Sequence, residues 1–208
     1  SLCGVKGEKK IFGNPFSQFV KLTNELKYYH YFTDKLCIAS RLYVGAGYAY
    51  GNATELPYSE QFYIGGANSL RAFTIRSIGP GSYRPDVSNE NGFFDQTGNF
   101  KLEANVELRV PIWGGLEGAL FVDAGNIWLL KKDDLRPGGE LTLKSFGRDI
   151  ALGTGLGIRY DIANYLVVRI DVGVPIHAPY YTQKSGYYNI EGSFWKNLRL
   201  HLAIGYPF

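Results

Sequence analysis

Apolar and polar residues alternate with a period of two along most of the chain. From Phe100 to Val110 every even position is apolar and every odd position is polar or charged. Such a period is typical of β-strands with one apolar and one polar face, and it recurs in six further stretches. The sequence therefore predicts an all-β antiparallel fold with seven strands, at residues 16–31, 36–51, 99–112, 116–129, 147–161, 165–177 and 197–208. Residues 1–15 are expected to hold part of an eighth strand.

The length of these strands and the residues at their ends favour a transmembrane barrel. Strands of about 11 residues or more exceed the usual 5 or 6 of a soluble sheet and match the roughly 9 to 11 that cross a bilayer at a tilt. Aromatic residues at strand ends, such as Tyr28, Tyr48 and Tyr160, are typical of the lipid–water interface. The alternative is a soluble sandwich or lipocalin-like barrel whose apolar face forms a dry core.

The connections between the strands alternate in length. Short turns at residues 32–35, 113–115 and 161–164 are separated by long segments at residues 51–98, 130–144 and 177–196. A bacterial outer-membrane barrel has short turns on the periplasmic side and long loops outside. Residues 52–98 are therefore predicted to form a long external loop.

Composition narrows the possibilities further. The chain has 208 residues, 22 Lys+Arg against 19 Asp+Glu, and no Met, so we expect a processed product or an excised fragment. A net charge of +3 is too small to indicate a nucleic-acid partner. Cys3 and Cys37 lack the paired spacing of a zinc site, and the sequence predicts no metal and no cofactor.

Three segments resemble motifs of one family, in that family's order. Residues 64–73, Ile-Gly-Gly-Ala-Asn-Ser-Leu-Arg-Ala-Phe, resemble the Gly-Gly-x-x-Ser-[Val/Leu/Ile]-Arg-Gly-[Phe/Tyr] signature of the outer-membrane protein assembly (surface antigen) superfamily of BamA, TamA and two-partner secretion transporters. Residues 121–128 resemble its Phe-x-Asp-x-Gly-x-[Val/Ile]-Trp strand, and residues 198–208 its C-terminal signal strand. The matching signature positions are Gly65, Gly66, Ser69, Leu70, Arg71 and Phe73, whereas Ala72 stands where the family has Gly, which permits a positive φ.

The resemblance implies a larger parent protein. Barrels of this family have 16 strands preceded by soluble POTRA domains, and the loop with the signature folds into the lumen between strands eleven and twelve. The whole chain, residues 1–208, would then be the C-terminal barrel half, strands ten to sixteen with a stub of nine. Nothing in it resembles a POTRA domain. A natural eight-stranded barrel is the alternative.

If the loop enters the lumen, Arg71 must find acceptors, because an unpartnered guanidinium is costly to remove from water. Strand parity places Glu107 and Asp123 on the polar face, and the family analogy sets the same acidic positions against this Arg. We expect Phe73 and Phe121 to pack beside this ion pair. Room for the loop would come from glycines on the lumen side, Gly45, Gly47, Gly153, Gly155, Gly157 and Gly173. The alternative is a solvated Arg71 and an ordinary lumen charge at Asp123.

The last strand is the second candidate site. Gly205 and Pro207 weaken strand pairing, because Gly lacks a side chain and Pro donates no ladder hydrogen bond. Together with Phe208 they are predicted to form a weak seam and C-terminal signal, where a client strand could pair with the exposed edge. The alternative is that Pro207 merely lies at a frayed terminus.

No catalytic site is predicted. His201 and Asp171 share the polar face of neighbouring strands, but no Ser nucleophile accompanies them, and residues 153–157 lack the dinucleotide spacing. The resemblance implies an assembly factor of the bacterial outer membrane that recognises and inserts client β-barrel proteins, with the lipid bilayer and accessory subunits as further partners. The alternatives are a two-partner secretion transporter and a small outer-membrane pore.

Overall fold

The computed structural model describes residues 9–33, 36–85, 95–162, 165–184 and 186–208. Its main body is one antiparallel sheet of seven strands in which each strand pairs with the next along the chain. The strands are β3 (Gln18–Tyr31), β4 (Cys37–Tyr50), β5 (Phe100–Trp113), β6 (Leu116–Trp128), β7 (Ala151–Ile162), β8 (Leu166–His177) and β9 (Arg199–Ile204). The predicted all-β antiparallel architecture is therefore confirmed.

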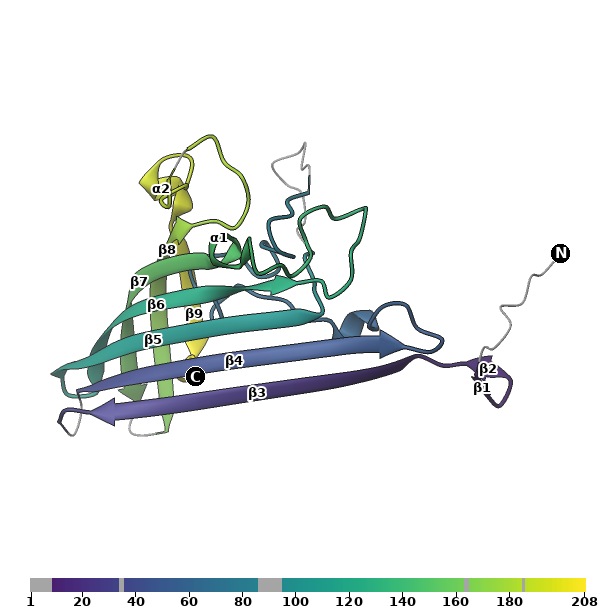
Figure 1. The fold of residues 1–208 in the computed structure, drawn as a ribbon. Coiled ribbons are helices and arrows are strands. Elements are labelled where there is room, and N and C mark those ends of the chain that lie inside the picture. Colours follow the sequence, from purple (N-terminus) through teal and green to yellow (C-terminus); the bar gives the residue numbers. More distant parts are fainter. Residues whose placement is uncertain (1–8, 34–35, 86–94, 163–164, 185) are drawn as a thin grey trace.

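The sheet curves into an open wall and does not close on itself, so β3 and β9 are its two edges (Figure 1). The short connections gather at one end of the strands, and the long ones, with the 3-10 helix η1 (Tyr58–Glu60) and the helices α1 (Phe146–Asp149) and α2 (Phe194–Asn197), lie at the other. This arrangement agrees with the predicted alternation of short and long connections. An open wall of seven strands is consistent with part of a larger barrel.

The structure corrects three predicted boundaries. In the described part of residues 1–15, β1 (Lys10–Ile11) and β2 (Asn14–Pro15) form their own small hairpin, so the predicted eighth strand is wrong there. Its turn residues have positive φ, 50° at Phe12 and 84° at Gly13, which suits a tight hairpin turn. Helix α1 delays the start of β7 to Ala151, and β9 ends at Ile204 instead of continuing to residue 208.

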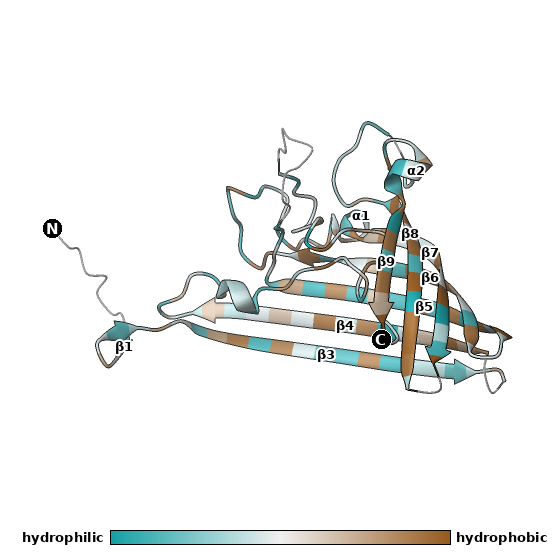
Figure 2. Ribbon diagram, turned by 180° about the vertical axis from the view of Figure 1, so that it is seen from behind, coloured by the Kyte–Doolittle hydropathy of each residue, from teal (hydrophilic) through white to brown (hydrophobic). Residues whose placement is uncertain are grey.

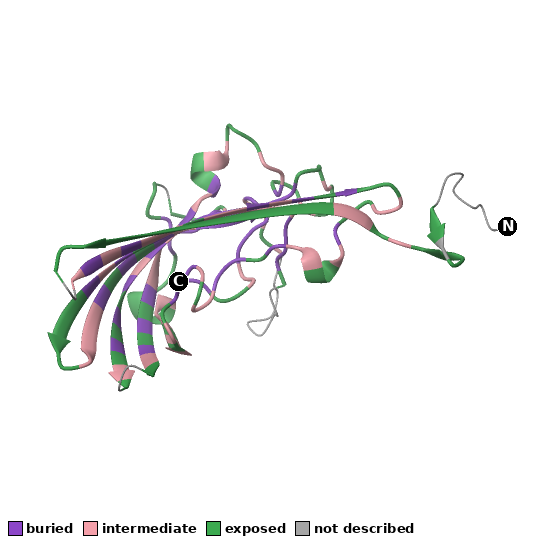
Figure 3. Cartoon of the chain, turned by 90° about the horizontal axis from the view of Figure 1, so that it is seen from below, coloured by how far each residue is buried: buried purple, intermediate pink, exposed green. Residues whose placement is uncertain are grey.

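The two faces of the sheet are reversed relative to a soluble protein. On β5 to β8 the polar face is buried: Glu107, Asp123 and Asp171 are each 0% exposed. The apolar side chains point outward, and Ile170 and Leu200 are 47% and 71% exposed. Figure 2 shows the alternating hydropathy along the strands, and Figure 3 the matching bands of buried and exposed residues. The soluble alternative with a dry apolar centre is therefore wrong.

Exposed aromatic residues lie near the strand ends, as the sequence predicts. At the short-turn end they are Tyr28, Tyr31, Phe32, Trp113, Tyr160 and Tyr165, and at the opposite end of β4 they are Tyr48 and Tyr50. This distribution suits an interface between lipid and water. Among the described residues, no helix is long and apolar enough to cross a membrane.

Candidate functional site

The loop between β4 and β5 lies against the polar face of the sheet, which we call the lumen face. Within the loop, Ile64, Leu70 and Arg71 are 0% exposed. They belong to a compact turn in which Gly66 N donates to Phe73 O at 2.9 Å and Ser69 N to Gly66 O at 3.1 Å. The signature segment, residues 64–73, is therefore buried against the lumen face of the sheet.

The two signature glycines make this turn possible. Gly65 and Gly66 have φ of 98° and 91°, a region that favours glycine. A Cβ atom on Gly65 would also collide with the backbone oxygen of Thr74. The glycine pair thus permits the chain to return on itself and to present the following residues to the strands.

Arg71 contacts two acidic residues on neighbouring strands. Its Nε and Nη2 donate to the two carboxylate oxygens of Asp123 at 2.9 and 2.8 Å, and its Nη1 donates to Glu107. Its backbone N–H also donates to Asp123, at 3.0 Å. All three side chains are fully buried. Because the guanidinium is paired in a bidentate geometry, its removal from water is compensated.

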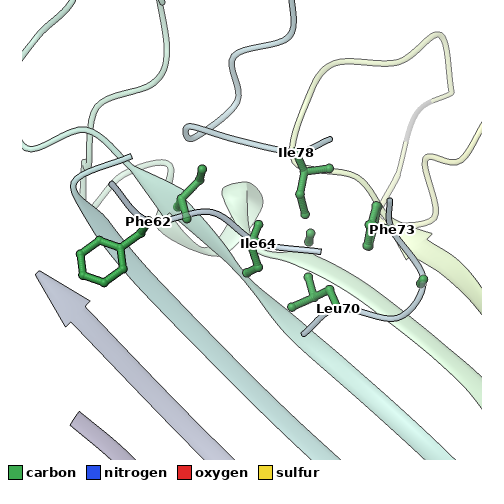
Figure 4. Close-up of a cluster of buried hydrophobic side chains, with 8 residues drawn as sticks. Phe62, Ile64, Leu70, Phe73 and Ile78 are labelled. Atoms are coloured by element: carbon green, nitrogen blue, oxygen red, sulfur yellow. The ribbon is translucent and has the colours of Figure 1, made fainter. Parts of the chain in front are cut away.

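The two predicted aromatic neighbours of this ion pair have different places. Phe121 lies beneath the Arg71 guanidinium, with 3.6 Å between Cζ and the ring centroid, a cation–π contact. Phe73 instead packs in an apolar cluster that the loop forms with the end of β6 and the start of β7 (Figure 4). The members of that cluster are Phe62, Ile64, Leu70, Ala72, Phe73, Ile78, Ile127 and Ala151.

Further buried polar residues surround the two acids, and the sequence did not single them out for this site. Arg109 Nε and Arg159 Nη2 each donate to Glu107 at 2.8 Å. Asn105 Nδ2 donates to Asp123 at 2.8 Å and to the Ser69 carbonyl at 3.1 Å. Their positions on the polar face were the available signal, since parity places each of them in the lumen.

Residues 67–69 of the loop are hydrogen-bonded to strands on both sides of the wall. On the β4–β5 side, Ser69 Oγ donates to Glu103 at 2.6 Å and Arg41 Nη2 to the Asn68 carbonyl at 3.0 Å. On the β8 side, Arg169 Nη1 donates to the Ala67 carbonyl at 3.0 Å. The signature segment therefore bridges strands that are not neighbours in the sheet.

The lumen glycines leave room for the loop and for the buried ion pairs. A Cβ on Gly45 would lie 2.5 Å from the Phe62 ring, and one on Gly47 would lie 2.6 Å from Leu56. A Cβ on Gly173 would lie 2.5 Å from the Arg71 carbonyl oxygen. Gly153 faces the Cβ of Ala72, Gly155 faces the Phe121 ring, and Gly157 faces the Arg159–Asp171 ion pair.

Ala72, the departure from the family signature, is accommodated without a left-handed backbone. The described non-glycine residues with positive φ are Phe12 and Arg76, so Ala72 is not among them. Its methyl group packs directly over Gly153, where a second Cβ would collide with it. A residue with a side chain is tolerated here because the opposing strand supplies the glycine.

The residues predicted to form the seam do not lie within the last strand. Gly205 has φ of 82° and follows the end of β9. Beyond it, Tyr206 Oη donates to Glu117 on β6 at 3.0 Å, and the Phe208 ring lies 5.3 Å from the Arg41 guanidinium. The tail therefore turns inward across the lumen, and the prediction that Gly205, Pro207 and Phe208 extend the edge strand is wrong.

The candidate His–Asp contact is also not formed. His201 lies opposite Asp171 in the register, but its Nε2 contacts the Arg71 carbonyl at 2.7 Å. In the described parts of the chain, no three His, Cys, Asp or Glu residues gather in a way that could hold a metal ion. Cys37 is a buried free thiol, and Cys3 lies outside the described residues.

A second set of contacts holds the outer part of the loop, which we call the outer clamp, Tyr58, Arg76 and Asp95. Arg76 Nη1 donates to Asp95 at 2.7 Å, and Tyr58 Oη donates to the same carboxylate at 2.8 and 2.9 Å. The hydrogen bonds from Arg76 and Tyr58 lower the pKa of Asp95. The bond to Asp95 raises the pKa of Tyr58. The clamp therefore favours a charged Asp95 and a neutral Tyr58.

Comparisons with known proteins agree with this architecture. Residues 5–208 match the Omp85 superfamily domain. The chain is 34% identical over 90 residues to the outer membrane protein assembly factor BamA of Neisseria meningitidis serogroup B, a match that covers 41% of this chain and 11% of that protein.

A solved structure of a BamA protein shows the same fold. The crystal structure of BamA from Haemophilus ducreyi lacking POTRA domains 1-3 matches with a TM-score of 0.59 and 21% identity, over 90% of this chain and 35% of that one. CdiB from Acinetobacter baumannii matches with a TM-score of 0.46 and 18% identity, over 78% of this chain and 24% of that one. The chain thus spans about a third or less of each of these proteins.

Proposed function

The chain belongs to the Omp85 superfamily and lies in the outer membrane of Gram-negative bacteria, and from this premise we propose that it is the C-terminal barrel portion of an assembly factor for outer-membrane proteins. Its substrates are unfolded β-barrel clients, and its work is to help their strands enter the lipid bilayer without catalysis. Accessory subunits are further proposed partners. The proposal is supported by the similarity to BamA of Neisseria meningitidis.

The observation that carries the proposal is the short terminal strand. Strand β9 has 6 residues, whereas β3 to β8 have 12 to 14. It pairs with β8 only from Arg199 to Ile204, and its other edge is free in the described sheet. A short strand offers few ladder hydrogen bonds to a neighbour, so a seam at this edge is weaker than the rest of the wall.

A weak seam suits the recognition of an unfolded barrel strand. Such a client presents its own backbone N–H and C=O groups, and an exposed strand edge binds them by β-augmentation. In a complete barrel the free edge of β9 would close against the first strand and part from it when a client arrives. The Arg71 network would hold the rest of the wall rigid meanwhile.

Depletion of the full-length gene product tests this function. We expect the amounts of many outer-membrane β-barrel proteins to fall together while lipid synthesis continues. If the barrel proteins keep their levels and one secreted polypeptide is lost instead, the chain belongs to a two-partner secretion transporter and the proposal is wrong. Ion conductance with no change in either group would indicate a pore.

Crosslinking tests the seam separately. A disulfide between cysteines at Ala203 and the facing position of the first barrel strand in the full-length protein should block client insertion. Addition of a reductant should restore insertion. Full insertion by the oxidised protein would contradict the proposed gate.

A further inference from the structure

The terminal strand is attached to the signature loop as well as to β8. His201 Nε2 lies 2.7 Å from the backbone carbonyl oxygen of Arg71. A carbonyl only accepts hydrogen bonds, so Nε2 carries the proton and donates it. Arg71 thus uses its guanidinium for Asp123 and Glu107 and its carbonyl for β9.

His201 contacts the loop, although an acidic residue lies opposite it on β8. That residue, Asp171, is ion-paired with two arginines: its two carboxylate oxygens lie 2.8 Å from Arg159 Nη1 and 2.7 Å from Arg169 Nη1. With both acidic oxygens turned toward arginines, the imidazole reaches past the strand to the loop.

At Arg71, the backbone of the loop packs closely against β8. A Cβ on Gly173 would meet the Arg71 carbonyl oxygen at 2.5 Å, so the loop lies directly on the strand surface there. Gly173 pairs with Arg199, two residues before His201. The absence of a side chain on β8 therefore lets the imidazole of the next strand reach the loop.

The neighbours of His201 on the lumen face of β9 do not take its place as a hydrogen-bond donor to the loop. Arg199 Nη1 donates to the carbonyls of Lys196 and Leu198, within its own turn. Ala203 has no polar side-chain group. Because β9 has only 6 residues and one paired edge, the hydrogen bond to the loop adds to a short ladder with β8.

We propose that His201 is a positioning residue that couples the terminal strand to the signature loop. Movement of β9 away from the wall breaks the bond to Arg71, and release of the loop removes the acceptor from β9. Such a coupling is reciprocal, so each event makes the other easier by the same factor. The contact between β9 and the loop does not depend on the proposed function. Only its use during client insertion rests on that function.

The first test follows both ends of the contact in the full-length protein in lipid bilayers. We expect His201→Leu to raise amide hydrogen exchange at residues 199–204 and proteinase K cleavage within residues 64–78, each on the order of fivefold to tenfold. His201→Gln keeps an N–H donor at similar reach and should bring both rates back to within about twofold of the natural protein. Leu202→Val, on the lipid-facing side of the same strand, is the matched control and should leave loop cleavage unchanged.

The second test reads the coupling from the loop. Arg71→Ala should raise exchange at residues 199–204, although the Arg71 side chain pairs with acids on β5 and β6. Asp123→Asn is the milder variant if Arg71→Ala does not assemble, and it should act in the same direction. His201→Leu should add little once the loop is already released.

The outcomes separate this inference from the proposed function. The inference is overturned if His201→Leu loosens β9 and leaves the loop protected, if neither segment responds, or if Gln fails to restore protection. Client insertion is measured on the same samples. Coupled protection without any client insertion would leave the inference standing and remove the assembly function, whereas insertion that ignores the seam disulfide would remove only the proposed gate.

Discussion

At the scale of single residues, the lumen site depends on the planar fork of Arg71. Two of its nitrogens match the two oxygens of Asp123, and the third reaches Glu107 on the next strand. A lysine at this position would offer one point charge and no bidentate pairing. Arg71 thus joins β5, β6 and the loop. Its buried charge is compensated by the two acids, which other side chains hold in place.

Parity predicted which residues enter the lumen, but not which of them would meet. Arg71, Glu107 and Asp123 lie together as the signature and the alternation suggested. The alternation also places Arg109 and Arg159 on the same face, yet their partners depend on strand stagger and side-chain reach. Phe73 packs in the apolar cluster of the loop, and its position in the signature does not reveal the other members of that cluster.

Gly173 provides a prediction at this scale. Gly173→Ala would place a methyl group about 2.5 Å from the Arg71 carbonyl oxygen, so the loop or β8 must shift. We expect a loss of about 1 to 3 kcal/mol in the free energy of unfolding, measured by urea titration in lipid vesicles. Gly118→Ala is the control, because its new Cβ would meet Ile112 at an ordinary 3.4 Å. Equal stability of the two variants would contradict the close approach of loop and wall.

At the scale of elements, the long strands were the most predictable part. Their alternation fixes one face for lipid and one for the lumen, and the starts and ends of β3 to β6 lie within about two residues of the predicted ones. The short elements could not be found in this way. Helix α1 and the β1–β2 hairpin have two to four residues per element, too few to show a period.

The end of β9 shows why a strand boundary needs more than a pattern. Alternation continues from Leu198 to Phe208, but Gly205 adopts a left-handed φ and turns the chain inward. Tyr206 then contacts Glu117 on the opposite part of the wall. In the sequence alone, Gly205 is compatible both with a continuing strand and with a turn. The contacts of residues 206–208 decide in favour of the turn.

The outer clamp gives a prediction for the loop as an element. Arg76 holds a left-handed φ of 58°, which is unfavourable for a residue with a side chain, while its guanidinium lies 4.4 Å from the Tyr63 ring centroid. Arg76→Ala loses the clamp and keeps the strain, whereas Arg76→Gly loses the clamp and relieves the strain. We expect proteolysis of the outer loop to be fastest for Ala, slower for Gly and slowest for the natural protein. Identical rates for all three would contradict a role of the clamp.

The pH dependence of the clamp follows from the two shifted groups. Asp95 has a lowered pKa, so its contribution is present above its ordinary value of 3.8 and is lost as pH falls through the folded value. Tyr58 has a raised pKa, so its contribution is present below 10.0 and is lost as pH rises through the folded value. The protection factor for amide hydrogen exchange near residues 95–98, from which the intrinsic pH dependence of exchange has been removed, should therefore be constant between these limits and fall beyond them. Tyr58→Phe should abolish the alkaline fall.

At the scale of the whole molecule, the solvent decides the fold. Strands β5 to β8 bury charged residues and expose apolar ones, and this pattern is stable only where lipid covers the outer face. The periodicity predicted this reversal only together with strand length and terminal aromatic residues, because these two features distinguish lipid from a protein core. The position of the loop in the lumen came from the resemblance, since no local pattern shows where a long connection packs.

Ile170, in the middle of β8 and 47% exposed, tests the lipid-facing surface. Ile170→Arg should reduce the free energy of unfolding in lipid vesicles by about 2 to 4 kcal/mol, the cost of a cation near the bilayer midplane. Tyr165→Arg lies just before β8, near the interface, and should cost about 0 to 1 kcal/mol. A tolerated arginine at position 170 would show that this face does not meet acyl chains.

The most direct test of the account is proteolysis of the signature loop in outer-membrane vesicles. Arg71→Ala leaves two buried acids without their partner, at a local cost of about 3 kcal/mol, and should open residues 64–78 to proteinase K at least tenfold faster than in the natural protein. Asp134→Ala, in an exposed ion pair with Lys132, is the control and should leave the rate unchanged. Cleavage of the Arg71→Ala loop at the natural rate would contradict the buried ion pair as the anchor of the loop.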